Sequence, residues 1–238
     1  MPKRLLPVCF ALVLAACSEE TLQPTSLRVA TATNFLTAAQ SLETAYEAKF
    51  QRQVTIVPGA TGLLVRQIEQ RAPFDLFLAA DETSAKRFET AELSTFPYAV
   101  GRLVLWSERV RVQLSDLSAL EGRIAVPNPE TAPYGKAAVQ VLKTSQLWSQ
   151  IKQRLVYGSS AAQVVQMVQS GAAEVCFCAE GQVRELTGFL GAVSPDLHEP
   201  LLQLGVPLRK GTDVDHFIEF LTSPEGQLII ATAGYDLP

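Results

Sequence analysis

Three stretches of this sequence place small or hydroxyl-bearing residues where an extended run gives way to a helical one. They are Thr33-Asn34, residues 59–62 (Gly-Ala-Thr-Gly) and residues 158–161 (Gly-Ser-Ser-Ala). The first turn of a helix exposes N–H groups without acceptors and carries a partial positive charge, so each turn is a potential seat for an anion. Ordinary N-capping explains one such turn, but three together, without a catalytic base or phosphate loop, indicate oxyanion binding.

The residue patterns that usually mark an enzyme of this size are missing from the sequence. There is no Gly-x-Ser-x-Gly, Walker loop, His-Glu-x-x-His or Gly-x-Gly-x-x-Gly pattern. His198 and His216 have no metal-ligating companions at useful spacing, and we interpret them as surface or helix-face residues. Asp81 lies where a helix is expected to begin, so capping explains it more simply than acid–base catalysis with Asp75. The sequence therefore predicts no catalytic residue, no metal site and no cofactor.

The elements that must position these turns alternate along the chain, which predicts an α/β fold with parallel sheets. The predicted strands cover residues 27–32, 53–57, 75–79, 102–106, 123–126, 155–157 and 174–178. Apolar residues recur every three or four positions from Phe35 to Phe50, as in a helix packed on a sheet. A second helix is predicted to end at Gly171, and a helical C-terminal stretch over residues 213–233 is predicted to restart at Pro224.

The N-terminal residues predict export and lipidation. Lys3 and Arg4 precede an uncharged apolar run that is too short for a comfortable membrane span and ends in Leu-Ala-Ala-Cys. We expect residues 1–16 to be a signal peptide, Cys17 to be the lipidated first residue of the mature chain, and residues 17–26 to form a polar tether. The alternative is a plain secretory signal that happens to contain a cysteine.

Charge and cysteine content narrow the class of protein further. Removing residues 1–16 takes away Lys3 and Arg4 and no acid, so the net charge of −4 becomes −6 in the mature chain. An acidic chain without a basic patch argues against nucleic acid and against an anionic membrane surface as partners. Cys176 and Cys178 alternate in an extended segment, which suits buried structural cysteines better than a disulfide or a Cys-x-Cys metal site.

Over residues 27–238 the chain resembles the periplasmic molybdate-binding proteins of bacterial ABC importers. The segments that carry the resemblance are residues 29–35 (Val-Ala-Thr-Ala-Thr-Asn-Phe), 59–62, 72–81 (Ala-Pro-Phe-Asp-Leu-Phe-Leu-Ala-Ala-Asp) and 127–135 (Pro-Asn-Pro-Glu-Thr-Ala-Pro-Tyr-Gly). The resemblance implies a two-lobed type II periplasmic binding protein fold with the ligand in the inter-lobe cleft. It implies that lobe one holds residues 27–98 plus 207–238 and lobe two residues 99–206, with closure about crossovers near residues 100–102 and 203–206.

The resemblance also implies which residues hold the anion. Thr33 and Thr61 are expected to donate from hydroxyl and backbone in one lobe, helped by the backbone of Asn34. Tyr134 and Ala161 are expected to donate backbone N–H groups from the other lobe. Threonine stands at 61 where serine is usual, and alanine at 161 where valine is usual, but threonine keeps the hydroxyl and alanine keeps the N–H.

A further position separates two branches of the resembling family. Some relatives use a tyrosine hydroxyl where this chain has Ala179, whereas another branch carries the Thr-Asn pair seen here at Thr33-Asn34. The chain therefore resembles the second branch, in which the threonine and asparagine of lobe one contribute donors.

The function implied is extracytoplasmic binding of molybdate or tungstate and delivery to the permease and ATPase of an ABC importer, by a lipid-anchored periplasmic monomer. Neutral donors without a carboxylate acceptor disfavour a protonated oxyanion such as phosphate, while cavity size must separate molybdate from the smaller sulfate. The alternatives are a carrier for another oxyanion such as sulfate, and a receptor lobe that presents its ligand state to a signalling partner. An exported hydrolase is a third, for which the sequence offers no nucleophile and base.

Overall fold

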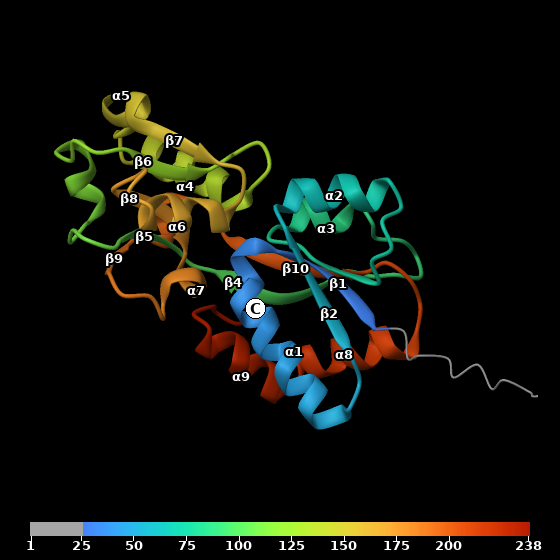
Figure 1. Cartoon of the computed structure of the whole chain (residues 1–238). Coiled ribbons are helices and arrows are strands. Elements are labelled where there is room, and N and C mark those ends of the chain that lie inside the picture. The colour runs from blue at the N-terminus through green and yellow to red at the C-terminus, as the bar shows by residue number, and fades with distance from the viewer. Residues whose placement is uncertain (1–25) are drawn as a thin grey trace, which may run out of the picture.

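The computed structural model describes residues 26–238, which form two lobes, each built on a five-stranded sheet with helices on both faces (Figure 1). The predicted signal peptide and Cys17 lie outside the described residues. Among residues 26–238, no helix is both long and apolar enough to cross a membrane.

Lobe one contains both ends of the described chain. Its sheet has the order β2-β1-β3-β10-β4. The strands are β1 (Leu27–Ala32), β2 (Val54–Gly59), β3 (Leu76–Leu78), β4 (Phe96–Gly101) and β10 (Leu201–Pro207). A short 3-10 helix, η1 (Thr33–Phe35), leads into α1 (Leu36–Phe50), which covers one face with α8 (Thr212–Thr222) and α9 (Pro224–Thr232). The other face is covered by α2 (Thr61–Glu69) and α3 (Glu82–Lys86) (Figure 1).

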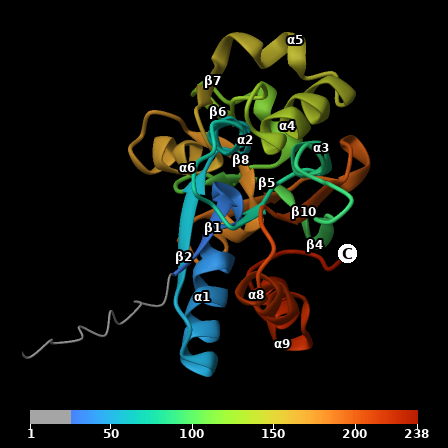
Figure 2. The ribbon, with the colours of Figure 1, turned by 90° about the vertical axis from the view of Figure 1, so that its right-hand side faces the viewer.

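Lobe two is formed by the middle of the chain and stands above lobe one in Figure 2. Its sheet has the order β7-β6-β8-β5-β9. The strands are β5 (Leu103–Ser107), β6 (Ile124–Pro127), β7 (Leu155–Gly158), β8 (Val175–Ala179) and β9 (Phe189–Ala192). The helices are α4 (Pro133–Thr144), α5 (Trp148–Ile151), α6 (Ala161–Gln169) and α7 (Glu180–Val183), and the 3-10 turns are η2 (Leu114–Ser118), η3 (Lys152–Arg154) and η4 (Pro195–Leu197). The cores that contain α4 and α6 lie on opposite faces of this sheet.

Local sequence signals account for several helix boundaries. The apolar stripe of α1 is buried at Leu42 and Tyr46, as its spacing predicts. Gly171 follows α6 with φ +78°, the left-handed conformation expected after a helix C-terminus. Pro224 occupies the first turn of α9, where its missing N–H costs nothing. These predicted boundaries are confirmed.

Both sheets are mixed, so the prediction of parallel sheets is wrong in part. Strand β10 runs antiparallel to both β3 and β4, and β5 runs antiparallel to both β8 and β9. The reason is topological, because the chain leaves lobe one along β4 and returns along β10 in the opposite direction. The other neighbouring pairs, β1 with β2 and β3 and β6 with β7 and β8, are parallel.

The chain crosses from lobe one to lobe two after β4 and returns before β10, and these two strands are neighbours in the sheet of lobe one. The boundaries expected at residues 98/99 and 206/207 fall inside β4 and β10, which pair with each other from Leu201 opposite Gly101 onward. Gly101 and Gly205 lie in these two strands and are candidates to absorb the dihedral change of closure, but neither has a positive φ. Each instead allows a close approach, since an added Cβ would lie 2.0 Å from Tyr134 Oη at Gly101 and 2.3 Å from the Phe96 ring at Gly205.

Candidate anion-binding site

The carboxyl ends of β1 and β2 bring the two predicted donor turns of lobe one together. The strands are parallel, and Ala32 is paired with Gly59 at their ends. The segments that follow, η1 beginning at Thr33 and α2 beginning at Thr61, therefore start side by side at one edge of the sheet. Thr61 is buried and Thr33 is half-buried.

In lobe two, the carboxyl ends of β6 and β7 bring together the starts of the two helices that carry the other predicted donors. Pro127 is paired with Gly158, and the next amide, Asn128 N–H, donates to the Gly158 carbonyl at 2.8 Å. Helix α4, with Tyr134 in its first turn, and helix α6, which begins at Ala161, therefore both start from this edge. Both residues are buried.

The two edges face each other across the interface between the lobes. The Gly62 N–H, in the first turn of α2, donates to the Thr131 carbonyl of the loop before α4 at 3.0 Å. On the other side, α6 lies against η1. A Cβ at Gly62 would be 3.2 Å from Thr131 Cα, so glycine allows this close approach. The structure thus gathers Thr33, Asn34, Thr61, Tyr134 and Ala161, hereafter the donor set, from both lobes into one place.

The helix N-termini of the donor set are short of local hydrogen-bond partners. The N-cap residues of η1, α2 and α4 are Ala32, Ala60 and Ala132, and none of them supplies a side-chain cap. Within residues 26–238, none of the five N–H groups of the donor set donates to a side chain or to a backbone carbonyl outside its own element. First-turn amides have no acceptor inside their own helix, so these groups are available to a ligand.

The threonines of the donor set are not helix caps in this structure. Thr33 and Thr61 each lie one residue inside their helices, and the N-cap positions before them are alanines. Helix α6 differs, because Ser160 caps it by accepting from the Gln163 N–H at 3.2 Å. Its first residue, Ala161, still has its own amide unused among the described residues.

The first turns at this site also carry no acidic residue. None is present in the first turns of η1, α1, α2, α4 or α6. The first turns of α3, α7, α8 and α9 all contain at least one, for example Glu82 in α3 and Asp213 in α8. Because an acidic side chain would offset the positive helix N-terminus, its absence leaves the field available to an external anion.

A buried polar cluster lies behind the donor set. Gln203, which is fully buried in β10, accepts a hydrogen bond from Asn34 Nδ2 at 3.0 Å and donates from Nε2 to Tyr134 Oη at 3.3 Å. Tyr98 Oη lies 2.9 Å from Gln203 Oε1 and 3.0 Å from the Ala79 carbonyl oxygen, so its proton is shared between two acceptors. Burial raises the pKa of both Tyr98 and Tyr134 well above the ordinary value. Both phenols therefore stay neutral.

Other residues singled out from the sequence have structural roles. Asp81 caps α3 by accepting from the Ser84 N–H at 2.7 Å, which confirms the capping interpretation. His216 Nδ1 is hydrogen-bonded to Tyr46 Oη at 2.9 Å, and His198 is half-buried beside η4. Ala179 is buried at the end of β8, with its N–H donating to Gln182 Oε1 at 3.1 Å.

Cysteine and metal chemistry give no second site in the described part of the chain. Cys176 and Cys178 are both buried and free of disulfides, as their spacing predicts. Burial raises the pKa of the Cys178 thiol well above its ordinary value, so it stays protonated. Across residues 26–238, no three His, Cys, Asp or Glu side chains are grouped so that they could hold a metal ion.

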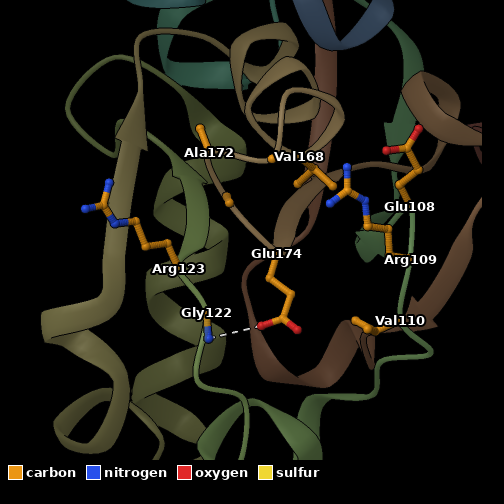
Figure 3. A pocket seen from close by; sticks show the side chains of 10 residues that line it. Glu108, Arg109, Val110, Gly122, Arg123, Val168, Ala172 and Glu174 are labelled. Carbon is orange, nitrogen blue, oxygen red and sulfur yellow. Dashed lines mark hydrogen bonds between the residues drawn. The ribbon is translucent and has the colours of Figure 1, made fainter.

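A cavity of about 500 Å³ lies at the opposite end of α6 from Ala161 (Figure 3). It is lined by the carboxylates of Glu108 and Glu174, the guanidinium groups of Arg109 and Arg123, and the segment after Val168. The Glu174 carboxylate accepts from the Gly122 N–H at 3.0 Å. Because its two glutamates offset its two arginines and the cavity faces the negative C-terminal end of α6, it suits an oxyanion less well than the donor set does.

Two features of the site were not anticipated from the sequence. One is the contact of Gly62 with Thr131, for which only the glycine in the first turn of α2 gives a hint. The other is the cluster around Gln203, which joins residues far apart in the chain. Its one local signal is a polar side chain between Leu202 and Leu204, in a segment that is otherwise apolar from residue 201 to 206.

Comparisons with known proteins agree on one family. The family model for bacterial extracellular solute-binding proteins matches residues 27–236. The molybdate-binding protein ModA of Azotobacter vinelandii is 37% identical over 247 aligned residues, covering 98% of this chain and 97% of the relative. ModA of Rhodobacter capsulatus is 34% identical over 217 residues, covering 87% of this chain and 86% of the relative. The solved periplasmic molybdate-binding protein of A. vinelandii matches with a TM-score of 0.83 and 31% identity, covering 90% of this chain and all of that one.

Proposed function

This chain belongs to the bacterial extracellular solute-binding proteins, and on that premise we propose that it binds molybdate between its lobes and delivers it to an ABC importer. One observation carries the proposal most directly. Helix N-termini from both lobes meet at one place, without acidic residues in their first turns and with amides left unused by the described residues. Such a set of N–H dipoles is suited to an anion.

The proposed ligand contacts follow from the chemistry of the donor set. Thr33 and Thr61 donate from hydroxyl and main chain, while Asn34, Tyr134 and Ala161 donate main-chain N–H groups. Lobe one supplies the first three donors and lobe two the others, so only the closed arrangement completes the set. Binding therefore stabilises closure, as in a population shift between open and closed forms.

Selectivity among oxyanions follows from the neutral donors. All five donors are uncharged, and none offers an acceptor to a ligand hydroxyl, so a protonated phosphate leaves its own O–H unpaired. Sulfate has no such proton and must be discriminated by size. Molybdate and tungstate are nearly the same size, so we propose that the site accepts both. Two relatives with more than 30% identity are named molybdate-binding proteins, which supports molybdate over sulfate as the anion that this chain transports.

Location and partners complete the proposal. We propose that residues 1–16 are removed as a signal peptide and that Cys17 is acylated, which tethers the protein to a membrane outside the cytoplasm. Lipoprotein processing supplies more than one acyl chain, as stable anchoring requires. The protein then acts as a monomer that transfers its anion to the permease of the importer and performs no catalysis. A Cys17→Ala variant is expected to leave the membrane fraction or to be mis-processed, and unchanged membrane association would refute the anchor.

Calorimetric titration with molybdate, tungstate, sulfate and phosphate tests the proposed ligand. Saturable binding of molybdate and tungstate, with much weaker binding of sulfate and phosphate, is the expected result. Tightest binding of sulfate would favour the alternative carrier. Failure of all four anions to bind would remove the proposal.

A further inference from the structure

Gln203 joins the two lobes through its side chain. Its amide oxygen receives hydrogen bonds from Asn34 and Tyr98, which both belong to lobe one, and its amide nitrogen donates to Tyr134, which belongs to lobe two. The side chain has no exposed surface. A buried amide that makes three hydrogen bonds is fixed in orientation, because turning it over would set the Gln203 and Asn34 N–H donors against each other.

The cluster lies where the chain passes from lobe one to lobe two. Gly101 ends β4 just before the crossing, and a Cβ there would lie 2.0 Å from Tyr134 Oη and 2.9 Å from Gln203 Nε2. The hydroxyl of Tyr134 therefore packs directly against the backbone of β4 at Gly101. Any rotation of lobe two about this strand changes the distance between Tyr134 Oη and Gln203 Nε2.

Two residues of the Gln203 cluster, one from each lobe, are themselves members of the donor set. Asn34 is a member of the set and follows Thr33, and its carbonyl oxygen also accepts a hydrogen bond from the Tyr235 hydroxyl. Tyr134 is a member as well, and its own amide is unused among the described residues. The side chains of two proposed donors are thus held by one glutamine, while their main-chain N–H groups are unused among the described residues.

We propose, building on the proposed function, that Gln203 is a positioning residue of the anion site. Its amide locks Asn34 of lobe one to Tyr134 of lobe two and so fixes the closed arrangement in which both halves of the donor set meet. Gln203 does not touch the anion. Its hydrogen bond to Tyr134 stabilises the closed form, and its loss speeds opening and ligand release.

A double-mutant cycle on the full protein tests this role. The variants are Gln203→Met, which keeps the volume but removes the hydrogen bonds, Tyr134→Phe, and the two combined. Molybdate affinity is measured by calorimetry and the release rate by stopped-flow displacement. We expect Gln203→Met to lower affinity about tenfold and Tyr134→Phe about threefold, mainly through faster release. The double variant is expected to be no weaker than Gln203→Met alone, because both changes break the same bond.

A matched control is available on the helix that carries Tyr134. Gln140 in α4 accepts from the Glu199 N–H at 3.1 Å, two residues before β10, so Gln140→Met removes a glutamine hydrogen bond to the returning segment while leaving the Gln203 cluster intact. Its release rate is expected to equal that of the wild type.

Three results would overturn the inference. They are an unchanged release rate in Gln203→Met, a drop in unfolding midpoint alone, and effects that add fully in the double variant. Should Gln203→Met fail to fold, the release rate of Tyr134→Phe decides, since an unchanged rate there also refutes the lock. Failure of the wild type to bind molybdate would instead refute the proposed function, so the two failures are distinguishable.

Discussion

Two groups of helices in this molecule have N-termini that are built differently. Helices α3 and α9 are capped by the side chains of Asp81 and Ser223, and each has a glutamate in its first turn. Helices α2 and α4 begin after alanine N-caps, make no side-chain cap and have no acid in the first turn. The first group satisfies its own exposed amides and positive end, whereas the second leaves both to a partner. At α2 and α4 the proposed site therefore coincides with helix starts that lack both a cap and an acid, whereas α6 keeps the Ser160 cap and lacks only the acid.

The largest effect on molybdate affinity is predicted for a variant that adds an acidic residue to the first turn of α2, as α3 and α9 already have. In Thr61→Asp, a carboxylate lies at the N-terminus of α2 about 4 Å from the bound anion, and like-charge repulsion there is about 4 kcal/mol at an effective dielectric constant of about 20. We expect molybdate affinity to fall by about a thousandfold or more. The free energy of unfolding is expected to fall, because Thr61 is buried and a carboxylate there loses its hydration, while the helix dipole recovers about 0.3–1 kcal/mol of that cost. Calorimetry and chemical denaturation measure the two quantities.

Thr212→Asp is the matched control for that variant. Thr212 is the exposed first residue of α8, so the substitution adds the same charge at the same helix position away from the donor set. Its affinity is expected to match that of the wild type. An equal loss of affinity in both variants would mean that net charge, and not the charge at α2, controls binding.

Removing a threonine hydroxyl is predicted to have the next largest effect. A hydrogen bond to a charged group is worth about 1.5–3 kcal/mol, so Thr33→Ala or Thr61→Ala is expected to weaken molybdate binding about ten- to hundredfold. Stability is expected to change little, because alanines occupy the N-cap positions of both helices. Thr→Ser at either position keeps the hydroxyl and is expected to bind nearly as well.

Ser223→Ala provides the opposite pattern. Ser223 Oγ accepts from the Gly226 N–H at 3.3 Å and caps α9, so its removal is expected to cost about 1 kcal/mol of stability without changing affinity. If the threonine variants behaved like Ser223→Ala, with lower stability and intact affinity, Thr33 and Thr61 would be structural residues and not ligands.

A smaller effect is predicted where the two lobes touch. Gly62→Ala places a Cβ 3.2 Å from Thr131 Cα, so the lobes must part by a few tenths of an ångström to relieve the contact. We expect affinity to fall about three- to tenfold, with little effect on stability. Gly171→Ala, at φ +78° and away from the interface, is expected to do the reverse and lower stability alone. Wild-type affinity in Gly62→Ala would show that this contact does not limit closure.

The smallest effect is predicted for pH. The donor set contains no carboxylate, histidine or cysteine, and burial raises the pKa of its own Tyr134 and of the neighbouring Tyr98. Phenols with raised pKa values stay protonated through neutral pH, so molybdate affinity is expected to be constant between about pH 6 and pH 9. A titration step within this interval would place an ionisable group in contact with the anion.

The sequence predicted most of the fold because its buried parallel strands and amphipathic helices give strong local patterns. The three strands it did not predict have weaker ones. Strands β4 and β9 are edge strands, and β4 contains Pro97, which only an edge tolerates easily. Strand β10 is interrupted by Gln203 in an otherwise apolar run. Its antiparallel direction depends on the path between lobes, which no local pattern encodes.

For the site as well, the sequence predicts features that depend on local patterns and misses contacts between residues far apart in the chain. Strand-to-helix turns with small residues are local, and the structure places Thr33, Asn34, Thr61 and Ala161 at them, whereas Tyr134 is expected only from the family resemblance. Their role as ligands stays a prediction. Only the structure shows that Thr33 and Thr61 are not helix caps. From the sequence, a threonine at the start of a helix is equally consistent with an N-cap residue. The link from Asn34 through Gln203 to Tyr134 spans both lobes, so only the folded chain reveals it.

The central claim is that amides from both lobes enclose one oxyanion, and a crystal structure with molybdate, located by its anomalous scattering, tests it most directly. The account predicts a single strong molybdenum peak between the lobes, with its oxygens within about 3 Å of the N–H groups of Thr33, Asn34, Thr61, Tyr134 and Ala161. A peak elsewhere, such as the cavity beside Arg109 and Arg123, or one bound by a single lobe, would contradict it.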